Sequence, residues 1–354
     1  MPEVWYFLLG LFFATYLVLG GYDYGVGMLL TRTARSVSNA DVGSAHGRRA
    51  PGTEAEPRRA TLAVLGPFFL GNEVWLVAAV GILFGAFPAL EGEFLAGLYP
   101  AVLLALVGVV VVTAAVPMRS RPTTARNRHG WDHVVVTGSF LAAFGWGAVM
   151  AGWLQGVPLT GVGHVEGVGH VFTPFVLAGG LALAGLIAVH GAALLALRLP
   201  VEPAARLALL GHRLVPVALV ALVVATVLGL LSERVRQSVQ QPAAAVLLPL
   251  VPSVALLVAR WAFARHRAVL AFAATSAALA VLVLLIGAAL LPYALPSSLD
   301  PAAGLTVRQA AASEPTLSLL GWLTLPLLPV LLGFQLMCWW VYRGRLNAGT
   351  PTYW

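Results

Sequence analysis

Nine long runs of apolar residues constrain the fold of this chain more than any other feature. A helix needs about 20 apolar residues to cross the hydrocarbon core of a bilayer. Backbone polar groups inside a bilayer must be satisfied within the protein, so we expect each run to form a helix. The predicted spans cover roughly residues 4–30, 64–87, 94–117, 133–155, 172–197, 213–232, 243–260, 268–291 and 317–342.

The composition agrees with a chain that lies within a membrane. Of its 354 residues, 59% are hydrophobic and 10% are charged, and the mean hydropathy is +0.88. Soluble proteins carry about 25% charged residues, so we predict an all-α integral membrane protein without a soluble domain. We expect one polytopic domain over residues 1–354, with four helices in 4–155, four in 172–291, a last helix in 317–342, and longer connections at 31–62 and 292–316.

The basic residues are distributed unevenly among the connections, and this predicts the topology. Eighteen of the 21 basic residues, all of them arginines, fall in alternate connections or after the last span. The opposite side holds only Arg234, Arg236 and Arg308. Cytoplasmic loops are enriched in arginine, so we expect an outward N-terminus, a cytoplasmic C-terminus, a cytoplasmic loop 31–62 and an external loop 292–316. The formal charge of +7 is therefore a topology signal, and nucleic acid is not an expected partner.

Two carboxyls within the predicted spans are the candidate catalytic residues. Asp23 lies in the first span, about 10 Å from its inner end at the rise of an α-helix. Glu73 lies about two turns into the second span if Pro67 occupies the first turn. Ionisable groups in hydrocarbon are costly and mark functional sites. Either the two carboxyls form a proton uptake route from the cytoplasm, or each is satisfied by a neighbour and holds helices together.

The histidines, the cysteine and the glycines carry weaker signals. Haem needs axial ligands, but of the eight histidines only His190 lies clearly in or near the end of an apolar run. We therefore predict no cofactor-binding and no metal-binding residue in this chain. The single cysteine, Cys338, excludes an intramolecular disulfide and a cysteine-rich metal site. The closely spaced glycines of the first span favour close helix packing, namely Gly20, Gly21, Gly25 and Gly27.

Several segments together resemble one known family. The strings LGGYDYGVGML (Leu19–Leu29) and GPFFLGNEVWLVAAVGILFGAFP (Gly66–Pro88) resemble the signature of subunit II of the cytochrome bd quinol oxidases. The segments Arg126–Gly147, Leu154–Leu159 and Leu291–Trp322 are similar to the family pattern too. The resemblance covers almost the whole chain, and the nine spans and the outward N-terminus agree with it.

The resemblance implies a fold and an activity. Subunit II is expected to have two four-helix bundles plus a peripheral helix, and to lie in the bacterial plasma membrane. Its expected partner is a homologous subunit I that carries haem b and haem d and the quinol site, and the resemblance also implies small single-helix accessory subunits. The complex oxidises quinol and reduces oxygen to water with protons taken from the cytoplasm. Subunit II is expected to be a haem-free scaffold with part of a proton path and, in some members, a structural quinone in a lipid-facing groove.

The sequence departs from the family pattern at two positions. The second motif usually reads GPxWDGNEVW, but Leu70 stands here in place of its aspartate, which the family assigns to a proton channel. The first motif often has an acidic residue where Gly20 stands. Protons would then enter through subunit I, or through Asp23 and Glu73 alone. Two further classes stay open from the residues: a secondary transporter, and a structural partner without chemistry.

The segregation of the arginines generates a prediction about topology. A reporter fused after Trp354 should behave as cytoplasmic, and a reporter inserted in loop 156–171 should behave as external, because arginine-rich loops stay inside. Cysteine labelling or an enzyme fusion active on only one side of the membrane measures this. The opposite pattern at both positions would overturn the nine-span topology.

Overall fold

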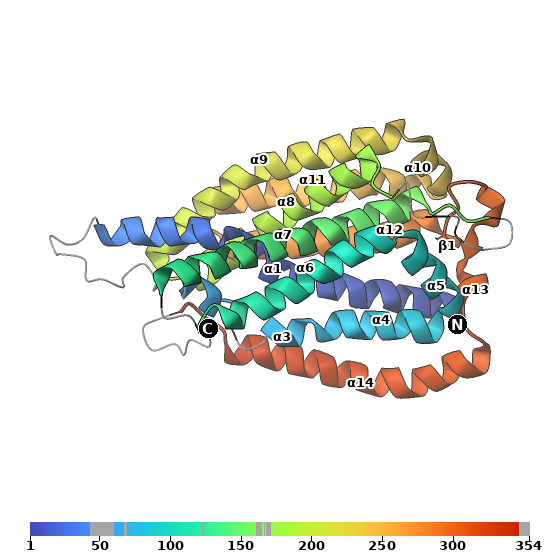
Figure 1. Cartoon of the computed structure of the whole chain (residues 1–354), viewed down its shortest axis with the longest axis horizontal. Coiled ribbons are helices and arrows are strands. Elements are labelled where there is room, and N and C mark those ends of the chain that lie inside the picture. The colour runs from blue at the N-terminus through green and yellow to red at the C-terminus, as the bar shows by residue number, and fades with distance from the viewer. Residues whose placement is uncertain are drawn as a thin grey trace.

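The chain is an assembly of long helices that lie side by side (Figure 1). The computed structural model describes residues 1–42, 60–66, 69–121, 124–160, 165, 167 and 171–346. Within these residues, 9 helices are long and apolar enough to cross a membrane, which confirms the predicted class and number. The N-terminal and C-terminal ends lie at opposite ends of the helices in Figure 1, as an odd number of spans requires.

The helices that could span a membrane follow the predicted order. They are α1 (Pro2–Val42), α4 (Val74–Ala86) with the short α3 (Phe69–Asn72) before it, α6 (Tyr99–Met118), α7 (Ala125–Gln155), α8 (Pro174–Arg198), α9 (Val201–Leu231), α11 (Pro242–Ala264), α12 (Ala268–Leu290) and α14 (Glu314–Val341). The shorter elements are α5 (Pro88–Gly97), α10 (Glu233–Ser238), α13 (Val307–Ala310), the 3-10 turn Pro301–Ala303, and an antiparallel pair of strands, β1 (Tyr293–Leu295) and β2 (Leu305–Thr306).

Three helices are longer than the apolar runs that predicted them. The loop predicted at 31–62 begins later, because α1 continues to Val42. In the same way α7 begins at Ala125 and α9 begins at Val201. Hydropathy reports where the chain is apolar, whereas the helix continues into polar sequence until a breaker; no glycine or proline occurs between Met28 and Val42. Residues 43–59 and Pro67, on which parts of these predictions rested, lie outside the described residues.

The helices form two bundles with one peripheral helix, as the resemblance implied. In the first bundle α1 packs on α4 and α7, and α7 packs on α6. In the second, α8, α9, α11 and α12 close a ring in which each helix packs on the next. The two bundles meet where α1 and α7 pack against α8, which is the most enclosed of the long helices. Helix α14 runs along the outside of the first bundle, next to α4 (Figure 1).

Polar contacts at one end of the molecule hold the peripheral helix. Only 6% of the apolar window of α14 is buried, so apolar packing contributes little to its position. After the helix, the Arg345 guanidinium donates to the carbonyls of Ala196 (3.3 Å) and Leu199 (2.5 Å) at the end of α8. The Leu346 amide donates to the Arg198 carbonyl at 2.7 Å, and the Arg198 side chain donates to the Tyr342 carbonyl. These groups satisfy carbonyls that a helix end leaves without intrahelical partners.

Glycines let α1 and α8 touch through their backbones. A Cβ atom at Gly191 would lie 2.2 Å from the carbonyl carbon of Gly25, and one at Gly25 would lie 2.3 Å from the Ile187 oxygen. A Cβ at Gly27 would lie 2.0 Å from the Ser139 hydroxyl of α7. Close packing is thus confirmed for Gly25 and Gly27. Gly20 has a different role, since the nearest atom to a Cβ there belongs to Tyr16 of the same helix, at 2.9 Å.

This crossing generates a prediction about assembly. Gly191→Ala places a methyl group against backbone atoms that cannot rotate away, so we expect a loss of about 1–3 kcal/mol, as for overpacked cores. The melting temperature and yield of the purified complex measure this. Gly81→Ala in α4 is the matched control, because nothing lies within 4 Å of a Cβ there, and it should leave stability unchanged or slightly raised. Equal stability of the two variants would contradict the close crossing.

Candidate functional site

A break between α3 and α4 carries the two polar residues of the second span. Glu73 lies between the end of α3 at Asn72 and the start of α4 at Val74, with φ −67° and ψ −19°. Asn72 is completely buried and Glu73 is half-buried, and both face α1. Leu70, which stands where the family has an aspartate, is 53% exposed. The polar groups of this segment therefore lie inside the bundle, and Leu70 lies on its outer surface.

Asp23 is held by Asn72. The Asp23 side chain is completely buried, and its Oδ2 accepts a hydrogen bond from the Asn72 Nδ2 at 2.8 Å. The same Nδ2 donates to the Tyr22 hydroxyl, also at 2.8 Å. Among the described residues, the Asp23 Oδ1 has no hydrogen-bond partner. One oxygen of this carboxyl is thus fixed, and the other is available for a further donor.

Glu73 is held by hydroxyls of α1. Its Oε1 accepts from the Tyr24 hydroxyl at 3.0 Å. Tyr24 in turn shares a short hydrogen bond with Tyr16, and the Tyr16 hydroxyl accepts from the Trp146 Nε1 of α7 at 3.1 Å. The Glu73 Oε2 is buried and has no partner within the described part of the chain. Two consecutive residues of α1, Asp23 and Tyr24, therefore bond to the two consecutive residues Asn72 and Glu73.

The peripheral helix completes the Asp23 side of the network. Gln335 of α14 accepts from the Trp75 Nε1 at 3.3 Å and donates to the Asn72 Oδ1 at 3.5 Å. Asn72 therefore uses its amide nitrogen toward α1 and its amide oxygen toward α14. The candidate site joins α1, α3, α4, α7 and α14, and the structure brings together both carboxyls named from the sequence.

His190 is a satisfied core residue. Its Nδ1 lies 2.8 Å from the Thr275 hydroxyl oxygen, and its Nε2 lies 3.0 Å from the Val18 carbonyl oxygen. The ring stacks on Phe272 with centroids 4.8 Å apart and an angle of 11° between the planes. Both ring nitrogens are thus occupied, and one face is covered. Within the described residues, no group of three or more His, Cys, Asp or Glu side chains could hold a metal ion; His46, His164 and His170 lie outside them.

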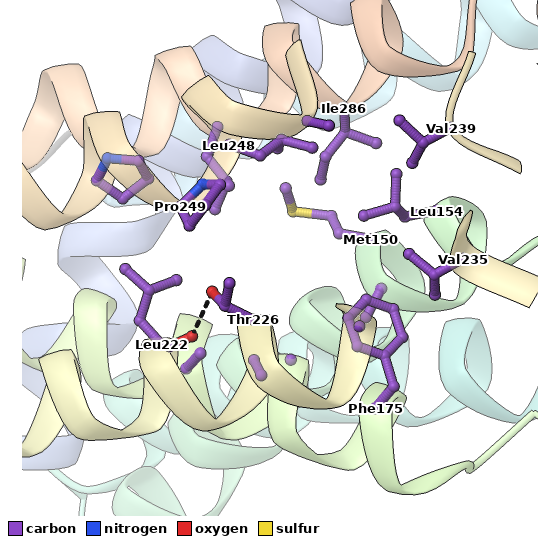
Figure 2. Close-up of a pocket in the computed structure, with 18 of the residues that line it drawn as sticks. Met150, Leu154, Phe175, Leu222, Thr226, Val235, Val239, Leu248, Pro249 and Ile286 are labelled. Carbon is purple, nitrogen blue, oxygen red and sulfur yellow. Dashed lines mark hydrogen bonds between the residues drawn. The ribbon is translucent and has the colours of Figure 1, made fainter. Parts of the chain in front are cut away.

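A large apolar cavity lies in the second bundle. It has a volume of about 730 Å³ and is lined mainly by apolar side chains of α7, α8, α9, α11 and α12. Figure 2 shows Met150, Leu154 and Phe175 pointing into this space. The Thr226 hydroxyl in its wall is bonded to the Leu222 carbonyl at 2.8 Å, so it offers no free donor. Polar lining residues, Arg236 and Gln240, come from α10 and the segment after it.

Comparison with known proteins decides the family. The family model described as cytochrome bd terminal oxidase subunit II matches residues 1–342. The chain belongs to this family. The cytochrome bd-I ubiquinol oxidase subunit 2 of Escherichia coli K12 is 28% identical over 97% of this chain and 94% of its own length. The cytochrome bd ubiquinol oxidase subunit 2 of Bacillus subtilis is 25% identical over 99% and 98% of the two chains.

A solved structure agrees with the family fold. A chain in the structure of bd oxidase from Geobacillus thermodenitrificans matches with a TM-score of 0.69, over 96% of this chain and 98% of that chain. At 16% identity this likeness concerns the fold alone. The subunit II chain described here is thus a multi-pass membrane protein of the bd-type oxidases, and its family name implies a subunit I partner.

Sequence reasoning missed the cavity and six members of the site, namely Tyr16, Tyr22, Tyr24, Trp75, Trp146 and Gln335. Tyr16, Tyr24 and Trp146 were not named as site residues, although Tyr24 directly follows Asp23 in the first motif. A hydroxyl beside a membrane carboxyl is a usable signal for Tyr24. Trp146 comes from a helix more than 100 residues away, and no local pattern connects it to Tyr16.

The geometry of His190 generates a prediction about haem. His190→Ala should leave the number of haems per purified complex unchanged, because both ring nitrogens are already bonded within the chain. Pyridine haemochrome quantification measures this. The variant removes a buried hydrogen-bonded ring, so Thr275→Val serves as a control that removes one of the same bonds without touching the imidazole. Loss of one haem in His190→Ala alone, with the complex intact, would assign His190 as a ligand.

Proposed function

We propose that this chain is the haem-free subunit of a bd-type quinol oxidase, with Asp23 and Glu73 taking part in proton uptake from the cytoplasm. The observation that carries the proposal is a pair of carboxyls within candidate spans, each bonded to the chain neighbour of the other: Asp23 to Asn72 and Glu73 to Tyr24, in a protein of this family. The complex oxidises quinol and reduces oxygen to water, and subunit I supplies haem b, haem d and the quinol site.

The histidine geometry supports a haem-free role. A haem ligand needs a ring nitrogen that is free to bind iron, and His190 has none. His212, near the start of α9, lies 3.3 Å by its Nδ1 from the Arg260 carbonyl. His129 pairs with Asp132, which also forms a buried ion pair with Arg119. These contacts support a subunit that serves as a scaffold for its haem-bearing partner.

The free oxygens of the carboxyls support proton uptake. Asp23 and Glu73 each have one bonded oxygen and one buried oxygen without a partner among the described residues. Asp23 lies in the second half of its candidate span, Pro2–Thr33. Glu73 lies near the start of its span. The bonds Asn72–Asp23 and Tyr24–Glu73 hold the two carboxyls at a similar level along α1, which supports a shared uptake route.

The apolar cavity supports the structural quinone proposed for this chain. A quinone has a long apolar tail, and sites for such ligands are concave and mostly apolar, with few polar groups. A volume of about 730 Å³ falls within the usual range of about 300–1,000 Å³. The Gln240 side chain donates to the carbonyls of Gln237 and Ser238, so the amide nitrogen at the polar end of the cavity already has partners.

The alternatives from the sequence are less well supported. A transporter has polar groups for its substrate near the membrane midplane, whereas the cavity of the second bundle is lined mainly by apolar side chains. Family membership also favours an oxidase subunit. A structural partner without chemistry differs from the proposal only in the role of the carboxyls, and the variants below separate the two.

Glu73→Gln tests the proton role. The substitution keeps the size of the side chain and an oxygen that can accept from Tyr24 while it removes the titratable group. We expect oxygen consumption with quinol to fall several-fold, with assembly and haem spectra preserved. A tenfold fall corresponds to about 1.4 kcal/mol of barrier, a moderate effect for one lost relay.

The control is Glu202→Gln, at the exposed first turn of α9, which should keep wild-type turnover. The double variant Asp23→Asn, Glu73→Gln should be at least as slow as Glu73→Gln. Wild-type turnover in both the single and the double variant would mean that subunit I supplies the protons and that this chain is a scaffold only.

A further inference from the structure

The hydrogen bonds that reach Glu73 have a fixed direction. The Tyr24 hydroxyl has one proton, and it donates this proton to the Glu73 Oε1. The bond between the two tyrosines must then be donated by Tyr16. The Trp146 indole has an N–H that can only donate, and it donates to Tyr16. In the hydrogen-bond series Trp146–Tyr16–Tyr24, every donor therefore points toward Glu73.

The Trp146 indole prevents this series of hydrogen bonds from conducting protons. A hydrogen-bonded wire passes a proton only if each member accepts one on one side and releases one on the other. The Trp146 Nε1–H has no lone pair for an incoming proton. Were these bonds reversed, Tyr16 would receive bonds from both Tyr24 and Trp146, and its own proton would point back to Glu73 and not to a further relay. The hydrogen bonds through the two tyrosines thus begin at an indole, which cannot relay a proton.

We propose that Trp146, Tyr16 and Tyr24 are positioning residues that hold the Glu73 Oε1 as an acceptor, so that Glu73 gains and loses its proton only at Oε2. The inference rests on the proposed role of Glu73 in proton uptake and specifies which oxygen performs it. In each exchange the proton arrives at Oε2 and leaves from Oε2, and both tyrosines keep their own protons. Oε2 is the oxygen that no described group holds.

The packing around Trp146, Tyr16 and Tyr24 supports a rigid positioning role. Tyr16 and Tyr24 are completely buried, and Trp146 is 6% exposed. The Tyr16 and Trp146 rings meet edge to face at 5.6 Å, and the Tyr16 and Tyr24 rings at 6.5 Å. Gly20 lies between the tyrosines on the same helix face, since residues four apart are neighbours. A Cβ there would come within 2.9 Å of the Tyr16 ring, so glycine makes room for this ring.

A second series of hydrogen bonds in the same site also runs from an indole to a carboxyl. The Trp75 indole donates to Gln335, Gln335 donates to Asn72, and Asn72 donates to the Asp23 Oδ2. It also begins at an indole and ends at one carboxyl oxygen, and it leaves the Asp23 Oδ1 without a described partner. Donors fixed in this way preorganise a carboxyl at little cost during turnover.

Infrared spectroscopy of the purified two-subunit complex tests the proposal. The carboxylic C=O band of Glu73 is assigned as the band that appears on acidification in the wild type and is absent in Glu73→Gln. In Tyr24→Phe this band should remain but shift in frequency, because the carboxyl loses its donor. Trp146→Phe should give a smaller shift in the same assay. Turnover of Tyr24→Phe should fall less than that of Glu73→Gln, because the tyrosine positions the carboxyl and no proton passes through it.

Tyr6→Phe is the matched control, since Tyr6 is a buried tyrosine of α1 whose hydroxyl donates to the Gly287 carbonyl, away from the site. It should change neither the band nor the rate. If Tyr24→Phe does not assemble, Tyr16→Phe serves in its place, with a smaller shift expected. The proposal is overturned if the Tyr24→Phe band does not move, if its turnover falls as far as that of Glu73→Gln, or if no band depends on Glu73. Wild-type turnover in Glu73→Gln, with the band shift present, would reject the uptake role and retain the positioning.

Discussion

The contact between α1 and α8 at Gly25 and Gly191 is the constraint on which the rest of the structure depends. Lipid tails are as apolar as the helix surfaces, so helices in a membrane associate through close packing and hydrogen bonds. Here two glycines bring the backbones into direct contact and join the two bundles. A helix turns by about 100° per residue, so Asp23, two positions before Gly25, faces the opposite side. One helix thus joins the bundles on one face and presents the candidate site on the other.

The polar groups of the first bundle are arranged so that nearly all of them are satisfied. An unpaired polar group in a medium without water costs several kcal/mol. The two indoles of the site, Trp75 and Trp146, each donate their single N–H to a side chain. Each of these side chains begins a series of hydrogen bonds that ends at a carboxyl oxygen. Four buried side-chain atoms lack a partner among the described residues, and two of them are the outer oxygens of Asp23 and Glu73. The other two are the hydroxyls of Thr113 and Ser139, so both groups with a proposed chemical role keep one oxygen open.

The sequence predicted those features that depend on local composition. The nine helices follow from apolar runs, and the close packing at Gly25 and Gly27 follows from residue size. Asp23 and Glu73 could be named because a carboxyl in an apolar run is unusual. The extensions of α1, α7 and α9 were missed because hydropathy does not report helix ends in polar sequence. The bond from Trp146 to Tyr16 and the cavity in the second bundle were missed because they join distant segments.

The position of Leu70 explains how this chain can lack the family's aspartate and still place carboxyls in its first bundle. Leu70 is exposed on the outer surface of the α3–α4 segment, so an acid there would face lipid or another subunit. Asn72 and Glu73 face α1, and their bonds to Asp23, Tyr22 and Tyr24 hold the two segments together. A bond of this kind contributes about 1.5–3 kcal/mol when one partner is charged. Glu73 therefore depends on α1 for its geometry and Asp23 depends on Asn72, and the residue at position 70 can change without disturbing either.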